Sequence, residues 1–97
     1  DSMILLVVKV KSPLPEEELR RRAKKREPDF KAFPGLLQKY YVKLGEPGLY
    51  GGVYVWDSME SLQAYKESDL AKSIPAAYEM VEPPEMEVMD IMFQLRD

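Results

Sequence analysis

The side chains that could carry chemistry in this chain are limited by two absences. The sequence holds no histidine and no cysteine among its 97 residues. These absences exclude an imidazole base, a thiolate nucleophile and the commonest metal ligands. Proton transfer and charge stabilisation must therefore come from Tyr, Lys, Arg, Asp, Glu, Ser or the backbone, and we expect no metal site.

Three residues on two neighbouring segments form the first candidate group. Lys39 would supply a cation, Tyr54 a phenol donor and Trp56 an aromatic wall. They become neighbours if the two segments pair as a hairpin that places Lys39 opposite Tyr54. Lys39 and Tyr54 are therefore candidate catalytic residues, and Trp56 is a candidate for binding the substrate. The alternative is that Lys39 extends along a subunit interface while both rings pack beside it.

Four further residues are candidates for the same site. Tyr65 and Tyr78 belong to segments predicted to be helical, and with Tyr40 they are candidates for substrate binding. Asp90 is the one carboxylate whose apolar surroundings in the sequence would suit a catalytic general base. The alternatives are a core role for the tyrosines, with their hydroxyls at the rim, and an ion-paired or solvent-facing position for Asp90.

The segment 49–65 organises these candidates. Its first half, up to Trp56, is rich in β-branched and aromatic residues and predicts a strand. Asp57 and Glu60 then match a capping box, so a helix is predicted to begin directly after the strand. That helix would fold Tyr65 back over the sheet and shape the space between them.

The chain before this segment predicts a strand, a helix and a second strand. The apolar run 3–10 is too short for a helix and predicts a strand covered on both faces. Pro15 suits the first turn of a helix, in which Pro28 is predicted to cause a kink or a restart. The basic run 20–26 reads as a solvated face that pairs with glutamates four residues earlier, including Glu16 with Arg20.

The hairpin and the C-terminal segments complete the order of elements. Residues 36–44 and 49–56 predict paired strands, with Leu37 opposite Trp56 and Tyr40 opposite Val53. Gly51 and Gly52 indicate a bulge or a close approach of another group. Helical structure is predicted over 70–78, interrupted at Pro75, and the last strand over 86–95.

This order predicts an α+β, ferredoxin-like βαββαβ fold with a four-stranded antiparallel sheet and both helical regions on one face. The strands are apolar or aromatic on both sides, and a sheet-sized apolar surface is rarely left in water. We therefore expect a homodimer that packs sheet face on sheet face.

Two segments resemble a known family: PGLLQK at 34–39 and GGVYVWDSMESLQAY at 51–65. They are similar to the antibiotic-biosynthesis-monooxygenase-like proteins of the dimeric α/β-barrel superfamily, and most of all to its YdhR-like members. The resemblance implies a homodimer with a pocket in each subunit between sheet and helices. It also implies cofactor-independent oxygenation of a small aromatic or polyketide-like substrate. Tyr65 and Pro75 stand where the haem-degrading branch has Trp and His, so haem degradation is not expected.

Three functions are compatible with the sequence: the implied monooxygenase, a non-catalytic binder of a small apolar or aromatic molecule, and a cyclase or isomerase of the same fold. The net charge of −3 and the pI near 5.0 argue against nucleic acid as a partner. No stretch approaches the roughly 20 apolar residues of a membrane span, and no signal peptide is visible. We expect a single cytoplasmic domain over residues 1–97.

Overall fold

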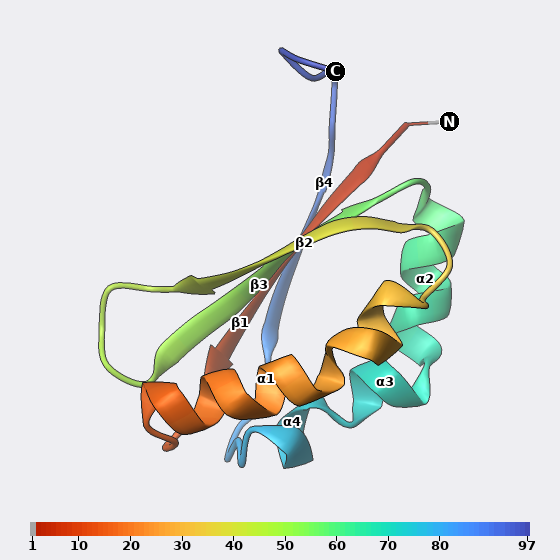
Figure 1. Ribbon diagram of the computed structural model, residues 1–97. Helices are drawn as coiled ribbons and strands as arrows, with labels where there is room; N and C mark the ends of the chain where they lie inside the picture. Colours follow the sequence, from red (N-terminus) through yellow and green to blue (C-terminus); the bar gives the residue numbers. More distant parts are fainter. Residues whose placement is uncertain (1) are drawn as a thin grey trace.

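The computed structural model describes residues 2–97, in which strands and helices follow the order βαββαβ with a divided second helical region. The elements are β1 (Ile4–Lys11), α1 (Glu16–Lys31), β2 (Leu36–Lys43), β3 (Leu49–Trp56), α2 (Met59–Glu67), α3 (Asp69–Lys72), α4 (Ile74–Ala77) and β4 (Glu85–Asp90). The strands form one antiparallel sheet in the order β2-β3-β1-β4. All the helices lie on one face of this sheet, and the other face is bare (Figure 1). The predicted ferredoxin-like α+β fold is confirmed.

The core lies between the sheet and the helices. β1 alternates strictly, so that Ile4, Leu6, Val8 and Val10 are buried while the residues between them are partly exposed. This period-2 burial is what one covered face of a sheet requires. The helices contribute residues that include Phe30, Leu62, Tyr65 and Ile74 to the same cluster. The opposite face of the sheet stays accessible in the single chain.

The hairpin of β2 and β3 has nearly the predicted register. Lys39 pairs with Tyr54 and Tyr40 with Val53, as expected. The predicted pairing of Leu37 with Trp56 is wrong, because the register shifts between Leu36 and Gln38 and brings Leu36 opposite Trp56. Leu37 is therefore an extra residue in β2, and the regular pairing resumes at Gln38. Lys39 still lies on the helix-covered face.

The two consecutive glycines of β3 serve a close approach. A Cβ on Gly52 would lie 2.8 Å from Tyr54 Cε1 and 3.2 Å from Lys39 Cε, and one on Gly51 would lie 2.9 Å from the Val8 carbonyl oxygen. Neither glycine tolerates a side chain without displacement of its neighbours. The absent side chain of Gly52 leaves the room in which Lys39 and Tyr54 lie.

The start of α2 differs from the predicted capping box. Ser58, not Asp57, is the N-cap residue, and its Oγ accepts a hydrogen bond from the Ser61 N–H at 3.2 Å. Asp57 instead accepts from the hydroxyls of Ser58, at 3.1 Å, and Ser61, at 2.6 Å. Both residue types cap helices well, and the one-residue offset places the Asp57 charge beside the positive end of the helix.

The Ser61 end of α2 packs against the turn that precedes β2. Gly35 has φ +83°, in the left-handed region, and a Cβ there would clash with Ser61 Oγ. The Gly35 carbonyl accepts from the Asp57 N–H at 2.9 Å. This glycine is therefore required both by its backbone conformation and by its contact.

Three other boundaries were predicted less well. Pro28 does not restart α1, which continues as one helix to Lys31. The region around Pro75 forms two short helices separated at Ser73. Ser68 caps the first of them, its Oγ accepting from the Ala71 N–H at 3.2 Å. β4 stops at Asp90, opposite Ile4, the first residue of β1, and one further backbone hydrogen bond follows, from the Ile91 N–H to the Met3 carbonyl at 3.0 Å. Within residues 2–97, no helix has the length and apolar character needed to cross a membrane.

Candidate functional site

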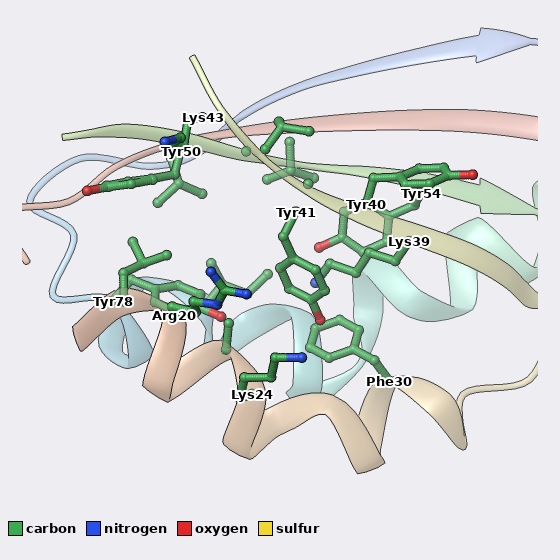
Figure 2. Close-up of a pocket in the computed structure, with 18 of the residues that line it drawn as sticks. Arg20, Lys24, Phe30, Lys39, Tyr40, Tyr41, Lys43, Tyr50, Tyr54 and Tyr78 are labelled. Atoms are coloured by element: carbon green, nitrogen blue, oxygen red, sulfur yellow. The ribbon is translucent and has the colours of Figure 1, made fainter. Parts of the chain in front are cut away.

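A cavity of about 510 Å³ lies between α1 and the helix-covered face of the sheet (Figure 2). β1 contributes Val8 and Val10 to its lining, as do Ile74 of α4 and Tyr78, the residue directly after α4. Cavities of roughly 300–1,000 Å³ with mostly apolar walls and a few polar groups are typical of small-molecule sites. The walls here match that description, because they are mostly apolar and are interrupted by charged side chains of α1 and β2.

Lys39 is enclosed by aromatic rings at the wall of the cavity. Its Nζ lies 3.5 Å from the ring centroid of Phe30, 4.4 Å from that of Tyr41 and 4.5 Å from that of Tyr54. Among residues 2–97, no carboxylate lies within 4.0 Å of this amine. We call Lys39 and these three rings the lysine cage. A cation held by ring faces and lacking a counter-ion is open to an anionic ligand.

The lysine cage changes the acidity of its amine. Burial, together with the nearby positive charge of Arg26, lowers the pKa of Lys39 from 10.5 to about 7. Removal from water disfavours the charged form of a lysine. Lys39 therefore changes its protonation close to neutral pH, in a chain that has no histidine to do so.

Arg26 was not predicted as part of this region. Its Cζ lies 5.7 Å from the Phe30 ring centroid and 5.9 Å from that of Tyr78, and its Nη2 donates to the Leu70 carbonyl at 3.1 Å. The signal was present in the sequence, because Arg26 falls on the same helical stripe as Leu19, Ala23 and Phe30. Arg26 was missed because the basic run 20–26 was interpreted as one solvated face.

Tyr54 and Tyr65 form a buried pair. Their hydroxyl oxygens lie 3.0 Å apart, and the two side chains are 2% and 0% exposed. Burial raises the pKa of Tyr54 well above its usual value, and burial also raises the pKa of Tyr65, to about 12. Both phenols are therefore protonated at neutral pH, so one hydroxyl donates to the other and the accepting one keeps its own O–H to donate elsewhere.

The aromatic candidates divide between the cavity and the core. Tyr54 and Tyr78 line the cavity, and burial raises the pKa of Tyr78 as well. Trp56 and Tyr65 are fully buried behind Tyr54 and do not line it. The Trp56 ring stacks on that of Tyr54 at 6.1 Å with an interplanar angle of 8°. These two residues therefore hold Tyr54 in place from the core side.

The remaining two candidates lie apart from the lysine cage. Tyr40 borders the cavity, but its pairing with Val53 puts its side chain on the opposite face of β2 from Lys39, and it is 56% exposed. Asp90 ends β4, is exposed and does not line the cavity. The structure thus brings Lys39, Tyr54 and Tyr78 together and leaves Tyr40 and Asp90 outside this group.

The residues present show no metal centre. No three Asp or Glu side chains gather to hold an ion anywhere in the described part of the chain.

Tyr41 was not among the candidates from the sequence, although it is a ring of the lysine cage. Its position two residues after Lys39 on the same strand places both on one face.

Solved structures with the same fold cover nearly the whole chain. A putative antibiotic biosynthesis monooxygenase from Caulobacter crescentus is 25% identical over 95% of this chain and 92% of its own, with a TM-score of 0.77. NE2512, a protein of unknown function from Nitrosomonas europaea, is 20% identical over 96% and 92%, with a TM-score of 0.80. SnoaB, a cofactor-independent oxygenase from Streptomyces nogalater, is 11% identical over 100% of both chains, with a TM-score of 0.78.

No curated protein sequence matches the chain. The family model described as "Putative mono-oxygenase ydhR" matches residues 5–95. This match covers all the helices and, apart from Ile4 at the start of β1, all four strands, and it includes the lysine cage. The chain therefore belongs to the ydhR family of putative mono-oxygenases.

Proposed function

We propose that this protein is a cofactor-independent monooxygenase that oxygenates a small aromatic or polyketide-like substrate in the cavity between sheet and helices. The observation that carries the proposal is the lysine cage: an amine with no counter-ion, ringed by three aromatic side chains at the wall of a cavity of about 510 Å³. An oxygenase without a cofactor needs an electron-rich substrate anion, a group that stabilises it, and a site shielded from water.

Lys39 is suited to form and hold such an anion. Because its pKa is about 7, a substantial fraction of the amine is neutral at neutral pH and can accept a proton from an acidic C–H or O–H of the substrate. The resulting ammonium then lies beside the anion that it has created and stabilises it. This step takes the role that an imidazole has in many enzymes, which this chain does not contain.

Tyr54 is suited to hold the substrate oxygen. Its hydroxyl remains protonated and shares a hydrogen bond with Tyr65 at 3.0 Å, so one phenol can donate while the other supports it. Oxygen then reacts with the electron-rich anion. For a ring methylene, as in an anthrone, one oxygen atom enters the substrate as a new carbonyl and the other leaves as water, and the two C–H bonds that are lost supply all four electrons. For a phenolic ring, one C–H and one O–H bond supply them. No metal or organic cofactor enters this balance.

Family membership supports the general kind of reaction. The matching model describes a mono-oxygenase, and SnoaB, with a TM-score of 0.78, is described as a cofactor-independent oxygenase. The lysine cage is the feature of this chain that gives the reaction a base and a cation. Tyr78 and the ring of Tyr41 would then contact the substrate.

A second part of the proposal is a homodimer formed through the bare face of the sheet (Figure 1). Val7, Val53 and Val55 on that face are only partly covered, and Leu37 and Tyr40 are 55% and 56% exposed. A contiguous apolar surface of this kind favours a two-fold contact with a second copy. Sedimentation at micromolar concentration tests it. A dimer that Val53→Lys converts to monomer supports the interface, and a wild-type monomer contradicts it.

Oxygen uptake with an anthrone and a dihydroxynaphthalene tests the enzymatic function. Uptake by the wild type that Lys39→Met abolishes supports the proposal. Lys25→Met is the matched control, because Lys25 is an exposed lysine on α1 outside the cavity. Binding without oxygen uptake or product formation for every ligand tried would instead favour a non-catalytic binder, the alternative that the lack of histidine supports. Rearrangement without uptake would indicate a cyclase or isomerase.

A further inference from the structure

The walls of the cavity carry more positive than negative charge, although the whole chain has a formal net charge of −3. The charged side chains that line it are four bases and two acids: Arg20, Lys24, Lys39, Lys43, Glu16 and Glu27. The Lys43 amine lies 3.5 Å from the Glu16 carboxylate and the Lys24 amine lies 3.4 Å from that of Glu27. Both acids are therefore paired within the wall.

Arg20 and Lys39 are the two bases of the wall that remain without a partner. Neither has a carboxylate within 4.0 Å among residues 2–97. The charge of the wall is thus concentrated at two places. This excess opposes the sign of the whole chain, so it is a local property of the cavity and not a reflection of composition.

The isolation of Arg20 corrects an expectation from the sequence. The pairing predicted between Glu16 and Arg20 on α1 does not form, because Lys43 on β2 holds Glu16 instead. Arg21 and Arg22 both bind Glu18, at 2.6 Å and 2.8 Å. Two members of the basic run line the cavity, Arg20 and Lys24, and of these Lys24 is paired with Glu27 while Arg20 has no acidic partner among residues 2–97.

The two unpaired bases are separated along the cavity. Phe30, whose ring lies under the Lys39 amine, comes ten positions after Arg20 on α1. This spacing corresponds to about 15 Å of helix at about 1.5 Å per residue. Figure 2 shows both side chains in the gap between α1 and the sheet, with the ring of Tyr41 hanging from β2 into the same gap. Apolar and aromatic residues that line the same cavity include Val8, Leu19 and Tyr78.

We infer that the ligand of this cavity is an aromatic acid, with more than one ring, whose ionisable ring oxygen meets Lys39 and whose carboxylate meets Arg20. This inference rests on the proposed function, because it names the substrate class of the same site. The apolar surface accommodates the rings. A guanidinium binds a carboxylate through two parallel hydrogen bonds, which fixes orientation as well as charge. Arg20 is then the residue that sets which end of the substrate reaches the lysine cage.

Matched bicyclic probes test the inference: a hydroxynaphthoic acid and the naphthol that lacks its carboxylate. Their dissociation constants are measured by fluorescence titration against the wild type, Arg20→Gln and Arg21→Gln. Arg21 is the control, because it bonds to Glu18 and does not line the cavity. We expect Arg20→Gln to weaken binding of the acid about ten-fold and to leave naphthol binding unchanged, since a charged hydrogen-bonded pair is lost only with the acid. Arg21→Gln is expected to change neither.

Two results would overturn the inference. One is an unchanged ratio of acid to naphthol binding in Arg20→Gln, and the other is a wild type that binds neither probe. Added salt is expected to weaken binding of the acid more than that of the naphthol. The oxygenase proposal fails separately, because the acid can bind as described while oxygen uptake is absent. Binding and uptake are measured independently for this reason.

Discussion

Replacing Lys39 by Met tests the burial of its charge directly, without any substrate. Folding lowers the pKa of this lysine from 10.5 to about 7, mainly because burial disfavours the ammonium. Between these two values the unfolded chain holds a proton that the folded chain lacks. The free energy of unfolding of the wild type is therefore expected to rise with pH in this window, and that contribution is absent from Lys39→Met.

The magnitude follows from the shift. Each pH unit inside the window is worth about 1.4 kcal/mol, so the step from about pH 7 to about pH 9 gives at most about 2.7 kcal/mol. The rings of the cage work in the other direction, because ring faces favour the ammonium, so this figure is an upper limit. We therefore expect the wild type to gain about 1–2.5 kcal/mol relative to Lys39→Met over this step.

Urea unfolding at the two pH values, at one fixed protein concentration, measures this difference. Lys25→Met removes the same charge from an exposed position on α1 and is expected to follow the wild type. If wild type and Lys39→Met show parallel pH profiles, the amine of Lys39 is not buried as described. The assignment of Lys39 as a base active near neutral pH would then fail with it.

Three further changes are each checked by urea unfolding. Gly35→Ala is expected to lower the free energy of unfolding by about 2 kcal/mol or more, because of left-handed backbone strain and the clash with Ser61. Gly45 is the control, since it has the same φ of +83° but a Cβ there would meet nothing within 4 Å. Equal losses of stability in Gly35→Ala and Gly45→Ala would refute the contact argument. Tyr54→Phe is expected to lower the free energy of unfolding by about 1–3 kcal/mol, because it leaves the buried Tyr65 hydroxyl unpaired. The double variant Tyr54→Phe with Tyr65→Phe should recover part of this loss. No recovery would contradict the pairing. Ser58→Ala should cost about 1 kcal/mol as a lost N-cap, and no loss would point back to Asp57 as the cap.

The order of elements and the placement of Lys39 opposite Tyr54 were predictable because alternating apolar residues leave little freedom of register. The bulge at Leu37 was not, since neither glycine nor proline marks it. Ser58 and Asp57 are both good N-cap residues, and the sequence alone does not decide between them. In the structure Ser58 is the N-cap of α2, and Ser61 of the same helix turn contacts the turn at Gly35. Such contacts depend on the tertiary arrangement.

The candidate site divides in the same way. Lys39 and Tyr54 could be grouped from the hairpin alone, and Tyr41 was within reach of the same reasoning. That Arg20 has no acidic partner among residues 2–97 was not predictable, because Glu16, its expected partner, pairs with Lys43 on another element. Trp56 and Tyr65 are apolar enough to be either wall or core, and only the packing around Tyr54 decides for the core.

The position of β4 at the edge of the sheet has a consequence for colloidal behaviour. One row of its backbone N–H and C=O groups has no strand beside it within residues 2–97, and an exposed strand edge is a template for fibrous aggregation. β4 interrupts its apolar residues with Glu85, Glu87 and Asp90, and Lys9 lies 3.5 Å from Glu87. These charges repel a second copy that approaches edge to edge. A chain with neutral residues in their place is expected to precipitate on storage even where its fold is intact.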